Sequence, residues 1–435
     1  MNYKEAVEYL MSLGNEVETM KLGLDNIRKL LDALGNPQNN YLKIQVAGTN
    51  GKGSVCAFLD SICLQAGIKA GIFTSPHLVS ITERIRIGGV DISEGGFAKI
   101  AGFVCEVSER LVAEGELECV PTYFEQVTAI TLVAFAEAEV ELAILETGLG
   151  GRFDATTAAN AEICAITRID LDHQEYLGNK IGEIATEKAA IIRADSKVVV
   201  GEQPDEAMEV ILARCRDIGA EPLLATETTV SAGPTPNHIS SSKRARSLPL
   251  VFLPESLGLL GRHQVENAKV AIVLGEILKE YFPISTQNII DGLHRARHPG
   301  RLEWIGQFLL DGAHNVNGAK ALCKYLDEFV HRPIMIIFGA MKDKNVGGMA
   351  KILFRKADEI ILTQPENSRA MAAHELLESV HAETADKRIT QALSVSEAIK
   401  IAREVSSEDG IILITGSLYL VGEARGVLTR QREQV

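Results

Sequence analysis

The chain has 435 residues, of which 46% are hydrophobic and 23% charged, and its formal net charge is −14. This length suits two or three domains, and the acidic balance disfavours non-specific binding to nucleic acid or to an anionic membrane. The seven cysteines form no CxxC pair, so we expect reduced thiols and neither a zinc site nor a disulfide framework. Because no apolar run reaches membrane-spanning length and no secretory signal is recognisable, we expect a soluble, cytoplasmic protein.

Short apolar runs rich in β-branched residues alternate with longer stretches of helical period, which predicts an α/β fold with a mostly parallel sheet flanked by helices. The predicted strands of this first sheet are residues 41–48, 69–75, 141–148, 162–169 and 197–201. Between the first two strands, apolar residues at helical spacing predict a helix that ends at Gly67.

The run RARHPGRLE (295–303) interrupts the helical pattern with Arg, His, Pro and Gly, which indicates a linker. After it the alternation restarts, with the predicted strands WIGQFLLDG, PIMIIFGA, EIILTQ and GIILITGS. We therefore predict an N-terminal domain over residues 1–295, a hinge over 296–300, and a smaller Rossmann-like α/β domain over 301–435. The polar segment 231–249, which includes a KRAR cluster, predicts a surface loop.

A glycine-rich loop from Gly48 to Ser54 lies between a predicted strand and a predicted helix, in the sequence IQVAGTNGKGS. Glycines let backbone N–H groups approach phosphate oxygens, a helix N-terminus favours anions, and Lys52 adds a positive charge. The loop departs from the pattern GxxxxGK[ST], because Val46 takes the first glycine position and Gly53 separates Lys52 from Ser54. It predicts a P-loop-type domain that binds ATP or GTP, without indicating which reaction follows.

Oxygen and nitrogen ligands follow three of the predicted strands, as expected for a ligand site in an open α/β sheet. These are Ser75, Glu146 and His173, which together suit magnesium ions that bridge phosphates. Each also has a plain alternative, because Ser75 precedes a proline in a possible turn and a lone histidine is more often structural. We favour the metal-binding interpretation because a carboxylate at an apolar strand end is costly without a partner.

Two further features are ambiguous by themselves. The segment GLGGRFDAT (148–156) is dense in glycine and contains Arg152 and Asp154, so it is either a loop that closes over a substrate or an ordinary surface loop. Lys188 lies within an apolar helical stretch, where a lysine commonly extends its amine to solvent. In the wall of an active site the same lysine can instead be carbamylated and act as a metal partner.

Ten motifs in order give the chain a specific resemblance. They are GTNGKGS, FTSPHL, TYFE, ETGLGGRFDAT, DHQ, EKAAI, HQVENA, PGRLE, DGAHN and GSLYLVGEAR. In this series, from about residue 20 to residue 426, the chain resembles folylpolyglutamate synthase and dihydrofolate synthase, enzymes of the Mur ligase superfamily. Two positions depart from the family pattern, because EKAAI replaces EKAGI and Phe153 stands where leucine is usual.

The resemblance implies a role for each matching residue. For ATP it implies Asn50, Gly51, Lys52, Gly53, Ser54, Asn267, Arg301 and Asp311. For the pterin substrate it implies Thr122, Tyr123, Phe124, Glu125, Phe153, Asp154 and Ala155. It implies Ser75 and Glu146 as ligands of one Mg²⁺ and His173 of a second, and Lys188 as an N6-carboxylysine. The expected catalytic group is Lys52, His173, Lys188, Asp311 and His314.

The activity implied by the resemblance is ATP-dependent addition of L-glutamate to a folate-type carboxylate through an acyl phosphate, in a cleft between two lobes. We expect a bifunctional enzyme acting on dihydropteroate and on tetrahydrofolate polyglutamates, as a monomer without nucleic-acid or membrane partners. A monofunctional folylpolyglutamate synthase remains open, as does a Mur-type ligase that extends a cell-wall nucleotide. A nucleotide switch without ligation is a further alternative, disfavoured by the second α/β domain.

Overall fold

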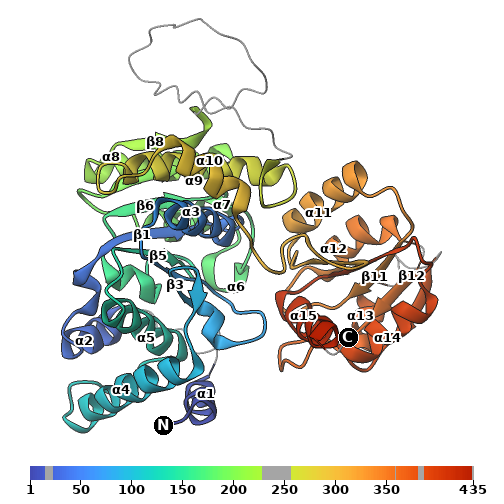
Figure 1. The fold of residues 1–435 in the computed structure, drawn as a ribbon, viewed down its shortest axis with the longest axis horizontal. Coiled ribbons are helices and arrows are strands. Elements are labelled where there is room, and N and C mark those ends of the chain that lie inside the picture. Colours follow the sequence, from blue (N-terminus) through green and yellow to red (C-terminus); the bar gives the residue numbers. More distant parts are fainter. Residues whose placement is uncertain (15–22, 228–255, 358, 381–386, 434–435) are drawn as a thin grey trace, which may run out of the picture. The chain divides into compact units, whose positions relative to one another are not determined.

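The computed structural model describes residues 1–14, 23–227, 256–357, 359–380 and 387–433. The described chain divides into two compact units (Figure 1). Unit 1 comprises 1–76, 81–258 and 264–297, and unit 2 comprises 77–80, 259–263 and 298–435. The predicted surface loop at 231–249 lies outside the described residues. Among the helices that are described, none is long and apolar enough to cross a membrane.

Unit 1 is built on an eight-stranded sheet in which only the first two strands of the row are antiparallel to their neighbours. The row runs β4 (Val90–Asp91), β3 (Ile85–Ile87), β2 (Ala70–Phe73), β5 (Leu142–Glu146), β1 (Leu42–Ala47), β6 (Ile163–Ile166), β7 (Lys197–Val200) and β8 (Pro222–Leu224). The five strands predicted for this sheet are confirmed. The central strands β5, β1 and β6 are almost wholly buried, which explains their nearly continuous apolar sequence.

Helices cover both faces of this sheet (Figure 1). They are α1 (Tyr3–Ser12), α2 (Asp25–Ala33), α3 (Lys52–Ala66), α4 (Glu94–Ala113), α5 (Tyr123–Glu137), α6 (Gln174–Leu177), α7 (Ile181–Ala189), α8 (Asp205–Ile218), α9 (His263–Leu278) and α10 (Thr286–Arg295). On one face, α1, α2, α4 and α5 share a core with β2 and β5. Around β6 and β7, α7 and α8 form a second core on the same face. The register shows this, because Gln45 of β1 is paired with Leu145 of the first core and with Cys164 of the second. The predicted end of α3 is confirmed, because Gly67 follows it in the left-handed conformation.

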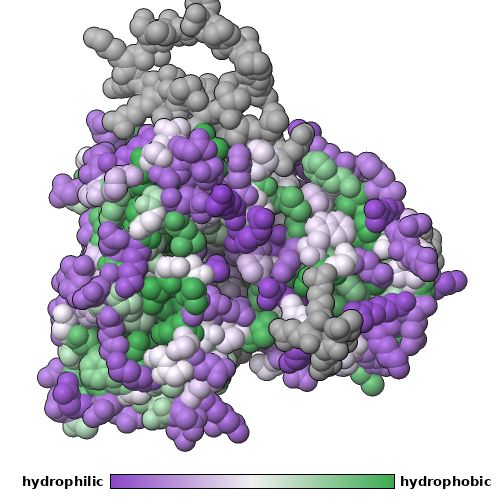
Figure 2. Space-filling model, viewed as in Figure 1, coloured by the Kyte–Doolittle hydropathy of each residue, from purple (hydrophilic) through white to green (hydrophobic). Residues whose placement is uncertain are grey.

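Unit 2 has a six-stranded sheet with helices on both faces. Its strands, in spatial order, are β13 (Arg388–Gln391), β12 (Glu359–Leu362), β11 (Ile334–Phe338), β14 (Ile411–Thr415), β10 (Phe308–Asp311) and β9 (Glu303–Ile305). Its helices are α11 (Val316–Phe329), α12 (Val346–Leu353), α13 (Ala373–Ser379), α14 (Val395–Val405) and α15 (Leu418–Glu433). Hydrophilic residues cover most of the visible face of each unit (Figure 2).

One predicted strand of unit 2 is wrong, because it is two strands. The sequence predicts a single strand over WIGQFLLDG, but this run forms two antiparallel strands, β9 and β10. Gly306 lies between them with a φ of 63°, a conformation that glycine adopts at little cost and that reverses the chain. The strands β3, β4, β8 and β13 were not predicted, because each has only two to four residues and little apolar sequence.

Candidate active site

The candidate site of unit 1 lies at the edge of the sheet where the parallel strands end. In the row β2, β5, β1, β6, each strand runs in the same direction, so their C-terminal ends meet at this edge. From β1 the chain continues to β2 on one side and later returns to β6 on the other. Such a reversal of strand order opens a crevice at the carboxyl ends of the strands, where α/β proteins bind their ligands.

The phosphate loop follows β1 and leads into α3. The amides of Thr49 and Asn50 donate to the carbonyl of Arg168 at 2.9 and 3.1 Å, which joins the start of the loop to the segment after β6. The helix begins at Lys52, after Gly51 with a φ of 90°. Because the first N–H groups of a helix have no acceptor within it, residues 52–54 present their amides at this end. The part of the loop whose amides are placed to meet an anion is therefore its second half, residues 51–54.

Two glycines of this loop are required by close neighbours. A Cβ atom at Gly48 would lie 1.9 Å from the hydroxyl oxygen of Thr167, and one at Gly51 would lie 2.2 Å from Oδ1 of Asn267. Asn267, predicted as a nucleotide contact, thus lies directly against the phosphate loop. Its Nδ2 donates to Gln264, whose Nε2 donates to the hydroxyl of Ser54 at 3.2 Å. Sequence reasoning missed Gln264, although it lies in the motif HQVENA, and it missed Thr167, which lies in none of the ten motifs.

Two lysines converge on one carbonyl of the loop. Nζ of Lys52 donates to the carbonyls of Gly48 and Thr49 at 3.0 and 3.3 Å, and Nζ of Lys188 donates to Gly48 at 2.9 Å. Burial is the larger cause, and the charge of Lys52 the next, of a shift that lowers the pKa of Lys188 to about 7. Nearby carboxylates of Asp172 and Asp154 oppose this shift. A substantial fraction of Lys188 is therefore a neutral amine at physiological pH, which is the nucleophilic form.

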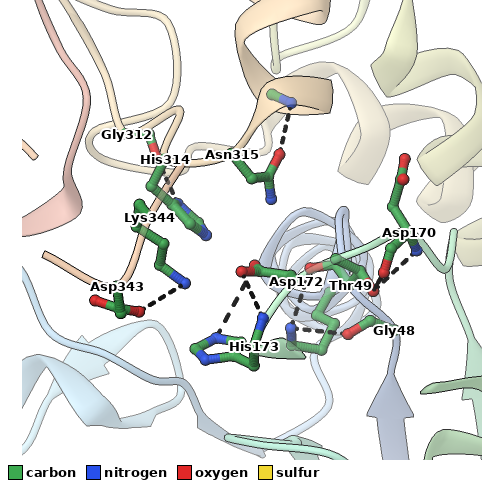
Figure 3. Close-up of polar contacts among 12 residues, drawn as sticks. Gly48, Thr49, Asp170, Asp172, His173, Gly312, His314, Asn315, Asp343 and Lys344 are labelled. Carbon is green, nitrogen blue, oxygen red and sulfur yellow. Dashed lines mark hydrogen bonds and ion pairs between the residues drawn. The ribbon is translucent and has the colours of Figure 1, made fainter. Parts of the chain in front are cut away.

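The three predicted metal ligands flank the phosphate loop. The backbone amide of Ser75 donates to Oε2 of Glu146 at 3.3 Å, so the segments after β2 and β5 meet there. Glu146 is only 6% exposed. His173 follows β6 and lies beside Asp172, with 3.9 Å between Nε2 and Oδ2 (Figure 3). Strand order therefore places Ser75 and Glu146 on one side of β1 and His173 on the other.

The donor set fits a hard cation that also binds phosphate. Among the described residues, no three His, Cys, Asp or Glu side chains gather closely enough to hold a metal ion by themselves. Magnesium characteristically takes one or two carboxylates and completes its shell with water and substrate phosphates. The buried carboxylate of Glu146 ends the strand beside β1, and it accepts from the amide of Ser75, which is consistent with that habit.

Residues 122–125, predicted to bind the pterin, begin helix α5. Thr122 is the N-cap of this helix and forms a capping box with Glu125. The Thr122 amide donates to Oε2 of Glu125 at 2.8 Å, and the Glu125 amide donates to the Thr122 hydroxyl at 3.4 Å. Tyr123 is 2% exposed. Phe124 is half-buried, and its ring lies 2.5 Å from the place that a Cβ of Gly148 would take. The T-x-x-E pattern is a helix-start signal that sequence reasoning did not use.

The glycine-rich segment 148–154 is anchored by its own side chains. The carboxylate of Asp154 accepts hydrogen bonds from the amides of Gly148 and Leu149, both at 2.9 Å, and from the amide and hydroxyl of Thr156. Arg152 binds Glu187 of α7 through Nε at 2.9 Å and through its amide, which donates to the Glu187 carbonyl at 3.0 Å. These hydrogen bonds hold the segment 148–154 to its own Asp154 and to α7.

Residues 153–155 differ in what they present. Phe153 is 38% exposed, while Asp154 and Ala155 are 5% and 3% exposed. Burial raises the pKa of Asp154, and its hydrogen bonds to Thr156, Leu149 and Gly148 oppose the shift. Phe153 is thus the residue of the three whose side chain is open to a ligand.

Unit 2 brings its own predicted residues together between the end of β10 and the start of α11. The carboxylate of Asp311 accepts from the amides of Leu302 and Ala313, both at 3.0 Å. Arg301 donates to the carbonyl of Gly312 at 3.2 Å, and Nδ1 of His314 lies 2.8 Å from the same carbonyl (Figure 3). Burial raises the pKa of Asp311, while the guanidinium of Arg301 opposes the shift. Three residues predicted from two motifs, PGRLE and DGAHN, therefore form one cluster.

Comparison with known proteins agrees with this architecture. Residues 46–275 match the Mur ligase middle domain, and residues 300–418 match the Mur ligase, glutamate ligase domain. The dihydrofolate synthase/folylpolyglutamate synthase of Bacillus subtilis is 34% identical over 421 residues, covering 93% of this chain and 95% of the relative. The chain belongs to this family. The family resemblance seen in the ten motifs is thereby confirmed, as is the two-sheet α/β fold.

Two other members of the family extend the comparison. A probable bifunctional folylpolyglutamate synthase/dihydropteroate synthase of Haloferax volcanii is 34% identical over 440 residues, or 99% of this chain and 51% of the relative. The chain thus spans about half the length of that relative. A bifunctional folylpolyglutamate synthase/dihydrofolate synthase of Yersinia pestis, solved with AMPPNP and a Mn ion, has a TM-score of 0.82 and 27% identity. That match covers 99% of this chain and 98% of the solved one.

Proposed function

We propose that the protein is an ATP-dependent ligase that joins L-glutamate to the carboxylate of a pteroyl substrate. The observation that carries this proposal is the adjacency of two sites on neighbouring strands. The phosphate loop follows β1, and Gly148, which contacts Phe124, follows β5. These two strands are neighbours, with Val46 of β1 paired to Glu146 of β5. A phosphate donor and an aromatic surface for a flat ring system are therefore supported at the same sheet edge.

The chemistry follows from the need to activate a carboxylate. An oxygen of the acceptor carboxylate attacks the γ-phosphorus of ATP, the bond to ADP breaks, and an acyl phosphate forms. The amine of glutamate then attacks the acyl carbon, phosphate leaves, and the amine proton is released to solvent or a nearby base. The protein's task is to position the reactants and to balance charge on the phosphoryl group, for which Lys52 and the amides of residues 52–54 are suited.

We propose Mg²⁺ as the cation of the site, with Ser75 and Glu146 holding one ion and His173 near a second. The Mn ion in the Yersinia relative supports a divalent cation. When bound, the metal neutralises phosphate charge and orients the γ-phosphoryl group. In unit 2, Arg301 and Asp311 are proposed nucleotide contacts, with His314 beside them.

We propose that Lys188 is carbamylated. Its neutral amine attacks the carbon of CO₂, one amine proton leaves, and the product is an anionic carbamate. This exchanges a buried cation that lies beside Lys52 for an anion, and so removes a repulsion. Protein incubated with ¹³C-bicarbonate should give one slowly exchanging carbamate carbon signal, absent from Lys188→Met. A wild-type spectrum without that signal would refute the modification.

The test of the function is a coupled measurement of ADP release and of product mass. With ATP, Mg²⁺ and L-glutamate, ADP should appear only when a pteroyl acceptor is also present, and the acceptor should gain one glutamyl residue. Dihydropteroate and tetrahydrofolate are supplied in separate reactions. Activity on both gives the bifunctional enzyme that we propose, as in the name of the Bacillus relative. Activity on tetrahydrofolate alone gives a monofunctional folylpolyglutamate synthase.

Rapid ADP release without any acceptor would contradict ligation and favour a nucleotide switch. Activity only on a cell-wall nucleotide would place the chain with the other Mur ligases. The cytoplasm is the proposed compartment, because ATP and reduced folates are found there, and fractionation tests it.

A further inference from the structure

The central strand β1 of the unit 1 sheet carries a buried glutamine, Gln45, that the proposed reaction does not use. Gln45 is 1% exposed and lies between Ile44 and Val46, which are wholly buried. Its strand is paired on both sides, to β5 and to β6. A buried amide at such a position is costly unless its donors are satisfied, so its partners indicate why the sequence has a glutamine here.

The Gln45 amide binds two hydroxyls that lie just beyond the glycine-rich segment 148–154. Nε2 donates to Oγ1 of Thr156 at 2.9 Å and to Oγ1 of Thr157 at 2.8 Å. Each hydroxyl has a single proton, and with Gln45 as donor that proton is directed elsewhere. Thr156 donates to Oδ1 of Asp154, and Thr157 donates to the carbonyl of Gly151 at 2.8 Å.

The relay ends on the backbone of the segment that carries Phe153. Asp154 accepts from the amides of Gly148 and Leu149, so both ends of the segment are held by one carboxylate. An ionised carboxylate is an acceptor only, so Thr156 donates to it and the Thr156 oxygen is left to accept from Gln45. Each hydrogen bond of the relay therefore donates in the same direction, from Gln45 to Thr156 and from Thr156 to Asp154.

We propose that Gln45 is a positioning residue for the pteroyl acceptor: through Thr156, Thr157 and Asp154 it fixes the segment 148–154 against which the acceptor binds. The Asp154 carboxylate, with its hydrogen bonds inside the protein, holds the segment in place, and Phe153 and Phe124 provide the surface. This inference rests on the proposed function for its substrate, but the relay itself is a property of unit 1.

A merely structural role for Gln45 makes a different prediction. If the relay only stabilised the core, its loss would lower the free energy of unfolding without selecting among substrates. If it positions the segment, its loss raises the KM for the acceptor while the KM for ATP stays unchanged, because the phosphate loop has separate anchors at Arg168 and Asn267.

The experiment compares Gln45→Leu, Thr156→Val and Thr156→Ser with wild type and with Thr363→Val as a control. Thr363 is wholly buried in unit 2, where its hydroxyl donates to the carbonyl of Ala392 at 3.1 Å. Gln45→Leu and Thr156→Val should raise the acceptor KM on the order of tenfold, the effect of one unsatisfied buried group. Thr156→Ser keeps the hydroxyl and should stay near wild type, as should Thr363→Val.

Amide hydrogen exchange gives a readout that does not depend on activity. In Gln45→Leu and Thr156→Val the amides of Gly148, Leu149 and Thr156 should exchange faster, while those of residues 49 and 50 should not. If wild type ligates no glutamate, the proposed function fails, and the exchange pattern still decides whether the relay holds the segment.

Any of four results would overturn the inference. The first is an unchanged acceptor KM in folded Gln45→Leu, and the second is an equal rise in the KM for ATP and for the acceptor. The third is the same kinetic change in Thr363→Val, and the fourth is unchanged exchange at residues 148 and 149. If Gln45→Leu does not fold, the pair Thr156→Val and Thr156→Ser carries the same comparison.

Discussion

Two glycine-rich loops follow neighbouring strands of the same sheet, and they use their backbone amides in opposite ways. After β1, residues 51–54 present amides at the start of a fifteen-residue helix, with side chains from α9 lying against them. After β5, residues 148–154 direct two amides onto their own Asp154. Glycine density alone does not distinguish a ligand loop from a self-anchored one. The two kinds of loop are distinguished by the element that follows the loop and by any carboxylate within the loop.

The largest expected effect is a loss of turnover when the lysine of the first loop is removed. Lys52→Ala should lower kcat on the order of 10³-fold, because it removes a charge placed to stabilise the transferred phosphoryl group. Steady-state ADP release with acceptor and glutamate measures it. Lys99→Ala removes an exposed lysine that pairs with Glu137 and serves as the matched control. Near-normal turnover in Lys52→Ala would remove the phosphate loop from the mechanism.

A pH dependence probes the first loop through Lys188, whose amine donates to the carbonyl of Gly48. Its pKa is lowered to about 7 from 10.5, so between these values the unfolded chain binds more protons than the folded one. The contribution of Lys188 to the free energy of unfolding should therefore rise with pH across that window and be absent in Lys188→Met. Denaturant titrations in CO₂-free buffer measure it. A wild-type curve parallel to that of Lys188→Met would contradict the shift.

Removing the carboxylate of the second loop should lower the free energy of unfolding more than it affects the reaction. Asp154→Ala leaves the buried amides of Gly148 and Leu149 without their acceptor, and we expect a loss of about 2–4 kcal/mol in the free energy of unfolding. The acceptor KM should rise as well, with the ATP KM unchanged. Asp154→Asn keeps one acceptor oxygen and should lose less. Equal losses in both variants would show that the carboxylate is not the anchor.

A smaller change at the second loop tests its contact with Phe124. The Cβ of Gly148→Ala would lie 2.5 Å from the Phe124 ring, so the ring must move. We expect a rise on the order of tenfold in the acceptor KM, the equivalent of about 1.4 kcal/mol of binding. Gly95→Ala, where a Cβ would have nothing within 4 Å, is the control. An unchanged acceptor KM in Gly148→Ala would argue against Phe124 as a binding surface.

The smallest expected effect concerns the helix start beside that ring. Thr122→Ala removes the N-cap of α5 and should lower the free energy of unfolding by about 1 kcal/mol. Thr122→Ser keeps the capping hydroxyl and should be nearly neutral. Thermal unfolding monitored by circular dichroism compares the two. If Thr122→Ala changes the acceptor KM far more than stability, Thr122 contacts the substrate directly.

The sequence predicted the parts of this molecule whose signals are local. The strand β1, the turn at Gly51 and the helix α3 follow from an apolar run, glycines and helical spacing within 26 residues, 42–67. The hairpin of β9 and β10 was missed because its two short strands read as one apolar run, with Gly306 as the sole signal of reversal.

Contacts between distant segments could not be predicted in the same way. Gln264 reaches Ser54 across 210 residues, and Gln45 reaches Thr156 across 111. Gln264 lies in the motif HQVENA and Gln45 in a strand, but neither position shows its partner in the sequence, and each becomes informative only when the fold places that partner beside it. The resemblance supplied Asp154 as a binding residue, whereas its hydrogen bonds reveal an anchoring role that sequence alone does not express.

The central claim is ligation through an acyl phosphate, and oxygen transfer tests it most directly. A pteroyl acceptor labelled with ¹⁸O in both carboxylate oxygens is incubated with the protein, ATP, Mg²⁺ and L-glutamate. The released phosphate should carry one ¹⁸O for each amide bond formed, and the product should keep the other. Phosphate without label, released alongside the amide product, would show that the carboxylate never attacks ATP.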